Sequence, residues 1–153
     1  MNSFYLTNIR LHGEPSSLTV EDGIITAVGA ENRKELPVRD GNGALALPGF
    51  LDLHTHGAAG VDVNAADPEG LRKISRFFAT QGVTGWQCSI LTDTREQTLK
   101  AIAAAREVIE AGSGGAALLG IHLEGPCLSV DYKGAMPEHL LMKEADIGLF
   151  REY

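Results

Sequence analysis

The sequence has few cysteines, and the two that it has are far apart. Only Cys88 and Cys127 occur among 153 residues, with no Cys-x-x-Cys pattern. This spacing does not suggest the disulfide framework that stabilises many small secreted proteins. We therefore interpret both as buried thiols in a reducing compartment rather than as a disulfide pair.

Basic residues and long apolar runs are also scarce. The chain has 13 Lys and Arg against 20 Asp and Glu, a net charge of −7, so it lacks the basic footprint of a nucleic-acid-binding protein. The N-terminus shows no basic segment followed by an apolar run, as a signal peptide would, and no apolar stretch approaches the length of a membrane span. We expect a soluble cytoplasmic protein with no nucleic-acid or membrane partner.

The residues that are present include enough apolar side chains, 44% of the total, for a real core. The first part of the chain is rich in β-forming residues at 3–11, 18–20 and 24–28. Asp22-Gly23 separates the last two runs and predicts a hairpin, because such turns need positive φ angles. Asn42-Gly43 is interpreted as the end of this β-unit. We predict a first domain over residues 1–45.

From residue 46 to 153, strand and helix patterns alternate. Apolar strands are predicted up to residue 56, over 83–91 and over 118–124, with helices over 67–82 and 94–111 between them. A further helix is predicted from residue 144 onward, and Gly-rich 57–60 is interpreted as a flexible loop. The strand–helix–strand rhythm is typical of parallel α/β units. The predicted fold class is therefore α/β.

The segment at 48–57 reads Pro-Gly-Phe-Leu-Asp-Leu-His-Thr-His-Gly and ends a predicted strand with two histidines. Because side chains alternate along a strand, His54 and His56 point to the same face. Two imidazoles on one face can bind one metal ion. A bare His-x-His pattern is weak evidence, because it more often marks two packed or polar histidines than a metal site. The apolar strand before it, the turn after it and a second candidate ligand downstream favour the metal site.

A second candidate ligand, Glu124, ends the third predicted strand. In parallel barrels the chemistry gathers at the carboxyl ends of the strands, so this carboxylate could join His54 and His56 around a divalent ion. The alternative is a glutamate exposed at a strand end or capping a loop. His122 has the same strand parity and is interpreted as a packing residue beside the site rather than as a ligand.

Three segments carry a resemblance to known enzymes. Residues 48–57 resemble the first-strand signature of the amidohydrolase superfamily. The sequence Gly-Ile-His-Leu-Glu-Gly-Pro at 120–126 is narrower and resembles the motif of the N-acetylglucosamine-6-phosphate deacetylase family, and so does Lys-Gly-Ala-Met at 133–136. The resemblance extends over essentially the whole chain.

The resemblance implies a (β/α)8 barrel beside a small β-sandwich, and an enzyme that hydrolyses N-acetylglucosamine 6-phosphate to glucosamine 6-phosphate and acetate. A full barrel needs about 250 residues, so the expected fold is a partial barrel of three βα units preceded by part of the β-sandwich. The family's catalytic aspartate would lie beyond the last residue, which leaves no catalytic residue within this chain. We therefore expect the isolated chain to be inactive.

The same resemblance implies the roles of individual residues. Glu124 matches the family's glutamate metal ligand, and His54 and His56 match a pair that holds a further metal in some members. Ala135 and Met136 match positions that contact the sugar, although some members have histidine where Met136 stands. The implied cofactor is a divalent ion, zinc first, with iron or another divalent ion as alternatives.

The expected partners are the small-molecule substrate and further copies of the chain in a homo-oligomer. Two alternatives stay open at this point. One is an inactive, truncated remnant that self-associates. The other is a different amidohydrolase, such as a dihydroorotase-like or aminoacylase-like enzyme, although the His-Leu-Glu-Gly-Pro context of Glu124 argues against it.

Overall fold

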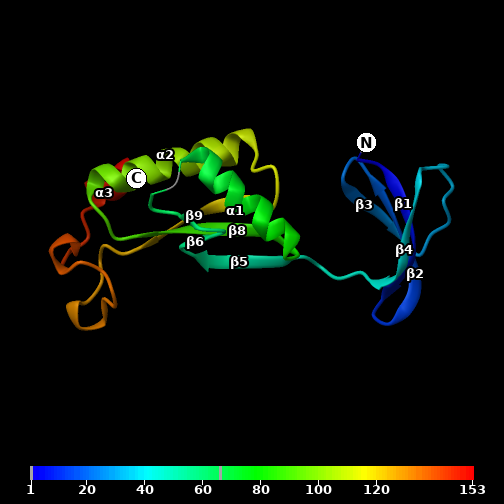
Figure 1. Cartoon of the computed structure of the whole chain (residues 1–153), viewed down its shortest axis with the longest axis horizontal. Coiled ribbons are helices and arrows are strands. Elements are labelled where there is room, and N and C mark those ends of the chain that lie inside the picture. Colours follow the sequence, from blue (N-terminus) through cyan, green and yellow to red (C-terminus); the bar gives the residue numbers. More distant parts are fainter. Residues whose placement is uncertain (1, 66) are drawn as a thin grey trace. The chain divides into compact units, whose positions relative to one another are not determined.

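The computed structural model describes residues 2–65 and 67–153. The chain divides into two compact units, Met1–Pro48 and Gly49–Tyr153. Figure 1 shows strands alone in the first unit, and strands covered by helices in the second. The mixture of helices and several sheets confirms the α/β class, whereas the β-sandwich and barrel assignments stay predictions.

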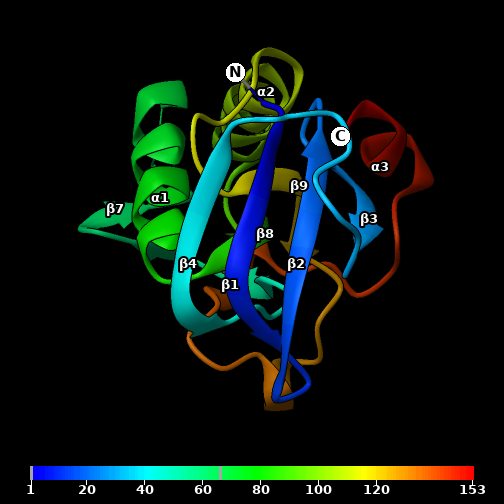
Figure 2. The same ribbon diagram turned by 90° about the vertical axis from the view of Figure 1, so that its right-hand side faces the viewer.

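The first unit is a four-stranded sheet with the strand order β3-β2-β1-β4 (Figure 2). Its strands are β1 Phe4–Leu11, β2 Glu14–Glu21, β3 Ile24–Val28 and β4 Val38–Leu45. The strand β2 is antiparallel to β1 and to β3, and β4 is parallel to β1. The predicted hairpin between β2 and β3 is confirmed, since Asp22 and Gly23 adopt φ angles of 50° and 83°.

The interpretation of Asn42-Gly43 as the end of this unit is wrong, because both residues lie inside β4. They adopt φ angles of 52° and 73° at a shift in the β1–β4 register, so they form a bulge that lets the strand continue. The carboxylate of Asp40 accepts hydrogen bonds from the backbone N–H of Asn42 (2.8 Å) and the side chain of Asn8 (2.7 Å). These two bonds, the first being the stronger cause, hold the pKa of Asp40 below its usual value.

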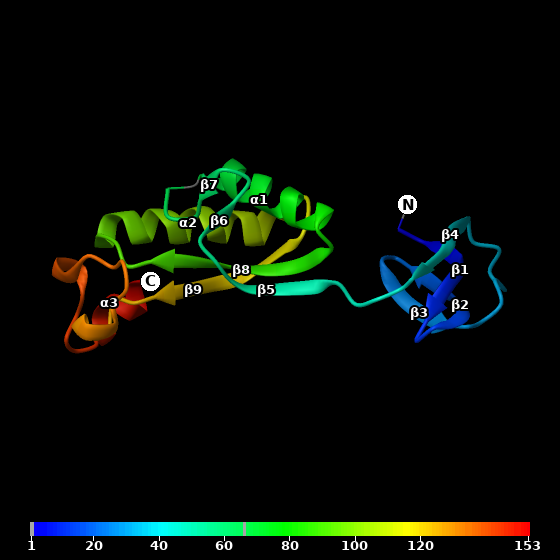
Figure 3. The same ribbon diagram turned by 60° about the horizontal axis from the view of Figure 1, so that its bottom comes forward.

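The second unit contains a three-stranded parallel sheet in the order β5-β8-β9. These strands are β5 Phe50–Thr55, β8 Val83–Leu91 and β9 Ala117–Glu124. The helices α1 Pro68–Thr80 and α2 Arg95–Ala111 lie over one face of this sheet (Figures 1 and 3). The predicted parallel order of the three strands is confirmed, and it brings their carboxyl ends to the same edge.

Both helices begin where the sequence predicts, directly after the capping residues Asp67 and Thr94. The Asp67 side chain accepts a hydrogen bond from the N–H of Gly70 (2.7 Å), which satisfies one of the donors left free in the first turn. Thr94 accepts in the same way from the N–H of Gln97 (3.2 Å). The side chain of Gln97 does not reach back to complete a capping box. It donates instead to the carbonyl oxygen of Asn64 (2.5 Å).

The core of the second unit lies between the sheet and the two helices. Trp86 is fully buried there, and its Nε1–H donates to the hydroxyl of Ser75 on α1 (2.9 Å). Cys88 is buried beside it, and desolvation raises the pKa of its thiol to about 11. Both cysteines are free, as predicted, but Cys127 is exposed, so its predicted burial is wrong.

Short elements complete the second unit. The predicted flexible loop at 57–60 is instead part of a small antiparallel hairpin, formed by β6 Gly57–Ala58 and β7 Val61–Asp62. Beyond β9 lie two single-turn 3-10 helices, Val130–Tyr132 and Glu138–Leu140.

The last helix, α3 Ile147–Glu152, begins later than residue 144. The Asp146 side chain caps it by accepting hydrogen bonds from the N–H groups of Gly148 (2.8 Å) and Leu149 (3.2 Å). Within residues 2–65 and 67–153, no helix has both the length and the apolar character needed to cross a membrane.

Candidate metal centre

Three predicted ligands meet at the carboxyl edge of the β5-β8-β9 sheet. His54 lies near the end of β5, His56 follows that strand directly, and Glu124 is the last residue of β9. Oε2 of Glu124 lies 3.1 Å from Nε2 of His54 and 2.9 Å from Nε2 of His56, and the two nitrogens are 3.2 Å apart. Residues that are about 70 positions apart in the sequence therefore present three donor atoms to one point, as the parallel strand order predicts.

The spacing of these atoms fits a shared divalent ion. Donors at the usual zinc distances of about 2.0–2.2 Å in tetrahedral geometry are separated from one another by about 3.3–3.6 Å. The three observed separations, from 2.9 to 3.2 Å, are slightly shorter. In the part of the chain that the structure describes, this is the one group of three His, Cys, Asp or Glu residues with donor atoms this close together.

The tautomer of His56 is fixed by the neighbouring strand. Its Nδ1 lies 2.9 Å from the backbone carbonyl oxygen of Ser89 on β8. A carbonyl can only accept, so Nδ1 carries a proton. In the neutral form of the ring the lone pair is then on Nε2, the nitrogen that faces Glu124. Metal-binding histidines are commonly oriented by such a bond from the second ring nitrogen.

Glu124 supplies the most direct indication that a cation belongs here. Its Oε2 is buried and makes no hydrogen bond of acceptable geometry, although both imidazoles are within 3.1 Å. A buried carboxylate oxygen without a partner is costly. Two acceptors at 2.9 Å also repel each other unless a proton or a metal ion lies between them. The donor set of two imidazoles and one carboxylate fits a divalent transition metal.

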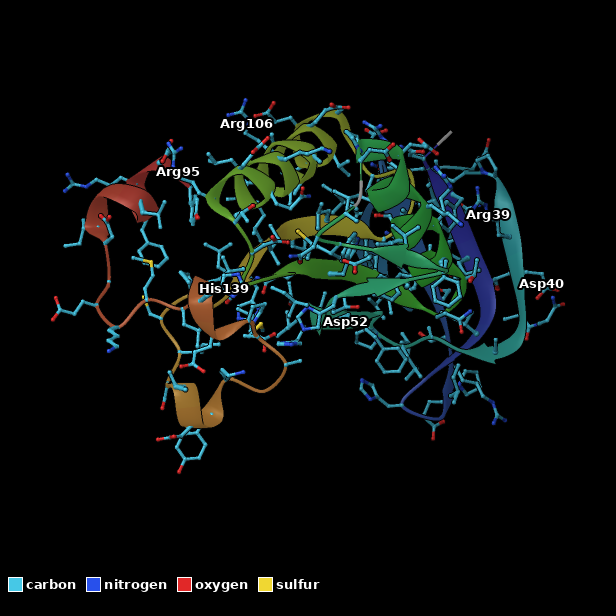
Figure 4. The ribbon with its side chains drawn as sticks, turned by 60° about the vertical axis from the view of Figure 1, so that its left-hand side comes forward. Arg39, Asp40, Asp52, Arg95, Arg106 and His139 are labelled. Carbon is cyan, nitrogen blue, oxygen red and sulfur yellow. The ribbon has the colours of Figure 1, made fainter. Side chains whose placement is uncertain are left out.

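The backbone around Glu124 is held in one conformation. The hydroxyl of Thr92 donates to the carbonyl oxygen of Glu124 (2.9 Å). The next residue, Gly125, has a φ angle of 95°, and a Cβ atom there would lie 1.9 Å from that hydroxyl oxygen. Only glycine is compatible with both features. On the other strand, the Asp52 side chain, labelled in Figure 4, accepts from the backbone N–H of His54 (3.1 Å).

The predicted substrate-contacting residues lie beside the same cluster. A pocket of about 600 Å³ is lined by His56 and Glu124 together with Ala135 and Met136. Met136 is buried and Ala135 is exposed. The side chain of Lys133 donates to the carbonyl oxygen of Met136 (2.9 Å) and closes the loop that carries both residues. His139, also labelled in Figure 4, is exposed and lies outside the cluster.

Sequence reasoning missed two residues that organise this region. Ser89 lies on the central strand β8 and contacts His56 and His122. The one hint in the sequence was a polar residue between the apolar Cys88 and Ile90, and all three are buried. Asn64 accepts from the N–H of Leu91 (2.8 Å) and donates to its carbonyl oxygen (3.1 Å), which fastens the segment after β7 to the end of β8. No pattern around Asn64 indicated this pairing.

Comparison with known proteins relates the chain to sugar-phosphate deacetylases. No protein-family model matches the chain. It is 32% identical over 140 residues to the N-acetylglucosamine-6-phosphate deacetylase of Bacillus subtilis, a match that covers 88% of this chain and 35% of the relative. It is 35% identical over 128 residues to the N-acetylgalactosamine-6-phosphate deacetylase of Escherichia coli, covering 80% of this chain and 32% of the relative.

A solved structure agrees with the sequence matches. The N-acetyl-D-glucosamine-6-phosphate deacetylase of Mycobacterium smegmatis, in complex with N-acetyl-D-glucosamine-6-phosphate, superposes with a TM-score of 0.80 at 29% identity. That match covers 99% of this chain and 40% of the neighbour. The chain thus spans about a third of the length of the curated relatives that it matches. By sequence and by structure, the chain is a homologue of the N-terminal portion of the N-acetylglucosamine-6-phosphate deacetylases, which are amidohydrolases.

Proposed function

We propose that this chain provides part of the metal centre of a deacetylase that hydrolyses N-acetylglucosamine 6-phosphate to glucosamine 6-phosphate and acetate. The observation that carries the proposal is the convergence of His54, His56 and Glu124 on one point. The relatives named above support the choice of substrate.

In this proposal the three side chains act as ligands of a divalent ion, with zinc as the first expectation and iron as an alternative. A divalent ion bound there supplies Lewis-acid chemistry, because it polarises an amide carbonyl and lowers the pKa of bound water toward about 7. Ser89 holds His56 with its lone pair directed at the cluster. The loop closed by Lys133 presents Ala135 and Met136 to the acetamido sugar in the adjoining pocket.

Hydrolysis needs a second function, the delivery of a proton to the leaving amine. We propose that the family's aspartate delivers this proton. The aspartate and the remaining metal ligands would both belong to the part of the relatives that lies outside the match. Groups that act as a unit in catalysis do not retain activity in proportion to the number present. The chain of 153 residues should therefore bind a metal ion without deacetylating the sugar at an enzymatic rate.

An acetate-release assay tests this proposal. N-Acetylglucosamine 6-phosphate and N-acetylgalactosamine 6-phosphate are offered to this chain and to the Bacillus subtilis relative, before and after chelation and after readdition of zinc. The relative should lose activity on chelation and regain it, and the chain should release no acetate above background. Robust metal-dependent turnover by the chain alone would contradict the proposed division of the site.

A second candidate function is a non-enzymatic, self-associating protein. It is favoured by apolar side chains that remain exposed on the sheet of the second unit, among them Leu51, Leu53 and Leu119, each more than half exposed. Such patches often mark association sites, and we propose a homo-oligomer for this reason. Sedimentation equilibrium measures the assembly: a multiple of 16.3 kDa supports it, and the monomer mass excludes it.

We further propose a cytoplasmic location. The support is the phosphorylated sugar in the names of the relatives, since charged sugar phosphates do not cross membranes unaided. Cell fractionation with an antibody against the chain tests this, and recovery from the periplasm or the medium would contradict it.

A further inference from the structure

Ser89 connects the two histidine-bearing strands through two different polar atoms. It lies on the central strand β8, is fully buried, and is the direct cross-strand partner of His122 on β9. Its carbonyl oxygen is 2.9 Å from Nδ1 of His56, and its hydroxyl oxygen is 3.1 Å from Nδ1 of His122. One residue therefore contacts two imidazoles, one from the β5 side and one from the β9 side.

The hydroxyl contact reaches the second candidate ligand indirectly. The ring of His122 packs against the ring of His54, with centroids 5.1 Å apart and an interplanar angle of 53°. His54 also meets the ring of His56 edge-on, with centroids 4.9 Å apart. Among the described residues, the hydrogen bonding and ion pairing of the His54 ring involve Nε2 alone, so its orientation depends on the rings packed around it.

We propose that Ser89 is the positioning residue of this metal centre. Its carbonyl fixes His56 directly, and its hydroxyl fixes His122, which in turn holds the ring of His54. This inference rests on the proposed metal centre and extends it to two residues outside the ligand set. A ligand ring must be held within a narrow range of positions to bind an ion tightly, and its supporting partners commonly control affinity by about 10- to 100-fold.

The chain offers a matched control for the hydroxyl. Ser75 is also fully buried, and its hydroxyl oxygen accepts one hydrogen bond from a ring N–H, that of Trp86 (2.9 Å), but it lies on α1 in the core. Ser89→Ala and Ser75→Ala each remove one buried hydroxyl with one ring partner. Both should lower stability, and only the first should affect metal binding.

Cobalt serves as the probe, because its visible absorption reports the number and geometry of its ligands. The dissociation constant for Co²⁺ and the spectrum are measured for the unaltered chain, for Ser89→Ala and for Ser75→Ala, with circular dichroism to verify folding. Ser89→Ala should weaken binding about tenfold or more and change the spectrum. Ser75→Ala should leave both as in the unaltered chain.

A second variant keeps the test decisive if Ser89→Ala does not fold. His122→Ala removes a half-buried side chain and should reproduce the weaker binding and the altered spectrum. Unchanged affinity and an unchanged spectrum in the folded variants would overturn the role of Ser89. Absence of Co²⁺ binding by the unaltered chain would instead overturn the metal centre, and this inference with it.

Discussion

Nε2 of His54 and Nε2 of His56 face each other at 3.2 Å, across a strand end where alternation places both side chains on one face. Their rings are nearly perpendicular, at 87°. Two unprotonated nitrogens at this distance repel unless a proton or a cation is shared. The His-x-His motif and the buried Oε2 of Glu124 therefore form a group of donor atoms suited to binding a divalent cation.

Cysteine labelling should separate the two thiols. Burial raises the pKa of Cys88 to about 11, whereas Cys127 is exposed. Because the thiolate is the reactive form, iodoacetamide at about pH 8 should modify one cysteine per native chain and two in denaturant. Mass spectrometry identifies the labelled residue, and Cys127→Ser should abolish the native label. Rapid labelling of Cys88 in the folded protein would contradict its placement in the core.

The stability of the first unit around the β4 bulge should fall in acid because Asp40 becomes protonated. Hydrogen bonds lower the pKa of this carboxyl in the folded unit, so its contribution to stability is present above its unfolded pKa of about 4. That contribution is lost as the pH falls through the lower, folded value.

We expect Asp40→Asn to reduce the loss of amide protection in β1 and β4 on acidification from about pH 6 to about pH 3. Hydrogen exchange measures this effect. Asp131→Asn in the other unit serves as the control. Equal acid sensitivity in Asp40→Asn and the unaltered chain would exclude a role for this carboxylate.

Asp67 should stabilise α1 through its cap. Asp67→Ala removes the acceptor for the N–H of Gly70 and should lower the free energy of unfolding by about 1 kcal/mol. Urea unfolding followed by the fluorescence of Trp86, the one tryptophan, measures this. Glu110→Ala removes an exposed i,i+4 partner of Arg106 and should change stability by less than about 0.5 kcal/mol. Similar losses in both variants would argue against the cap.

Gly125 should tolerate no side chain. Gly125→Ala places a Cβ atom against the Thr92 hydroxyl at a positive φ angle. It should lower the free energy of unfolding by more than the roughly 1–3 kcal/mol expected of backbone strain alone. Gly60→Ala is the matched control, because its φ angle is 76° and nothing lies within 4 Å of the added atom. Equal destabilisation of the two variants would show that the contact with Thr92 is unimportant.

Much of the second unit could be predicted from the sequence because its signals are local. The caps at Asp67 and Thr94 and the apolar runs at 83–91 and 118–124 each indicate one element. The parallel order of the strands then brings His54, His56 and Glu124 together without further information. Ala135 and Met136 were placed by family resemblance alone, and their roles stay proposals.

The parts that could not be predicted depend on contacts between distant residues. The bulge at Asn42-Gly43 looks like a turn in the sequence, and only pairing with β1 makes it part of a strand. The burial of Cys88 follows from an apolar strand, but Cys127 follows the Gly-Pro after β9 and is exposed. Ser89 carries no motif, and its importance appears only when His56 and His122 are seen on either side of it.

A calorimetric titration of the metal-free chain with zinc tests the metal centre most directly. We expect one ion per chain, and we expect Glu124→Gln to weaken binding by more than the roughly 100-fold that marks the upper range for supporting residues. Glu138→Gln, outside the cluster, is the control and should bind zinc as the unaltered chain does. The absence of zinc binding, or binding that Glu124→Gln leaves unchanged, would contradict the assignment of His54, His56 and Glu124 as ligands.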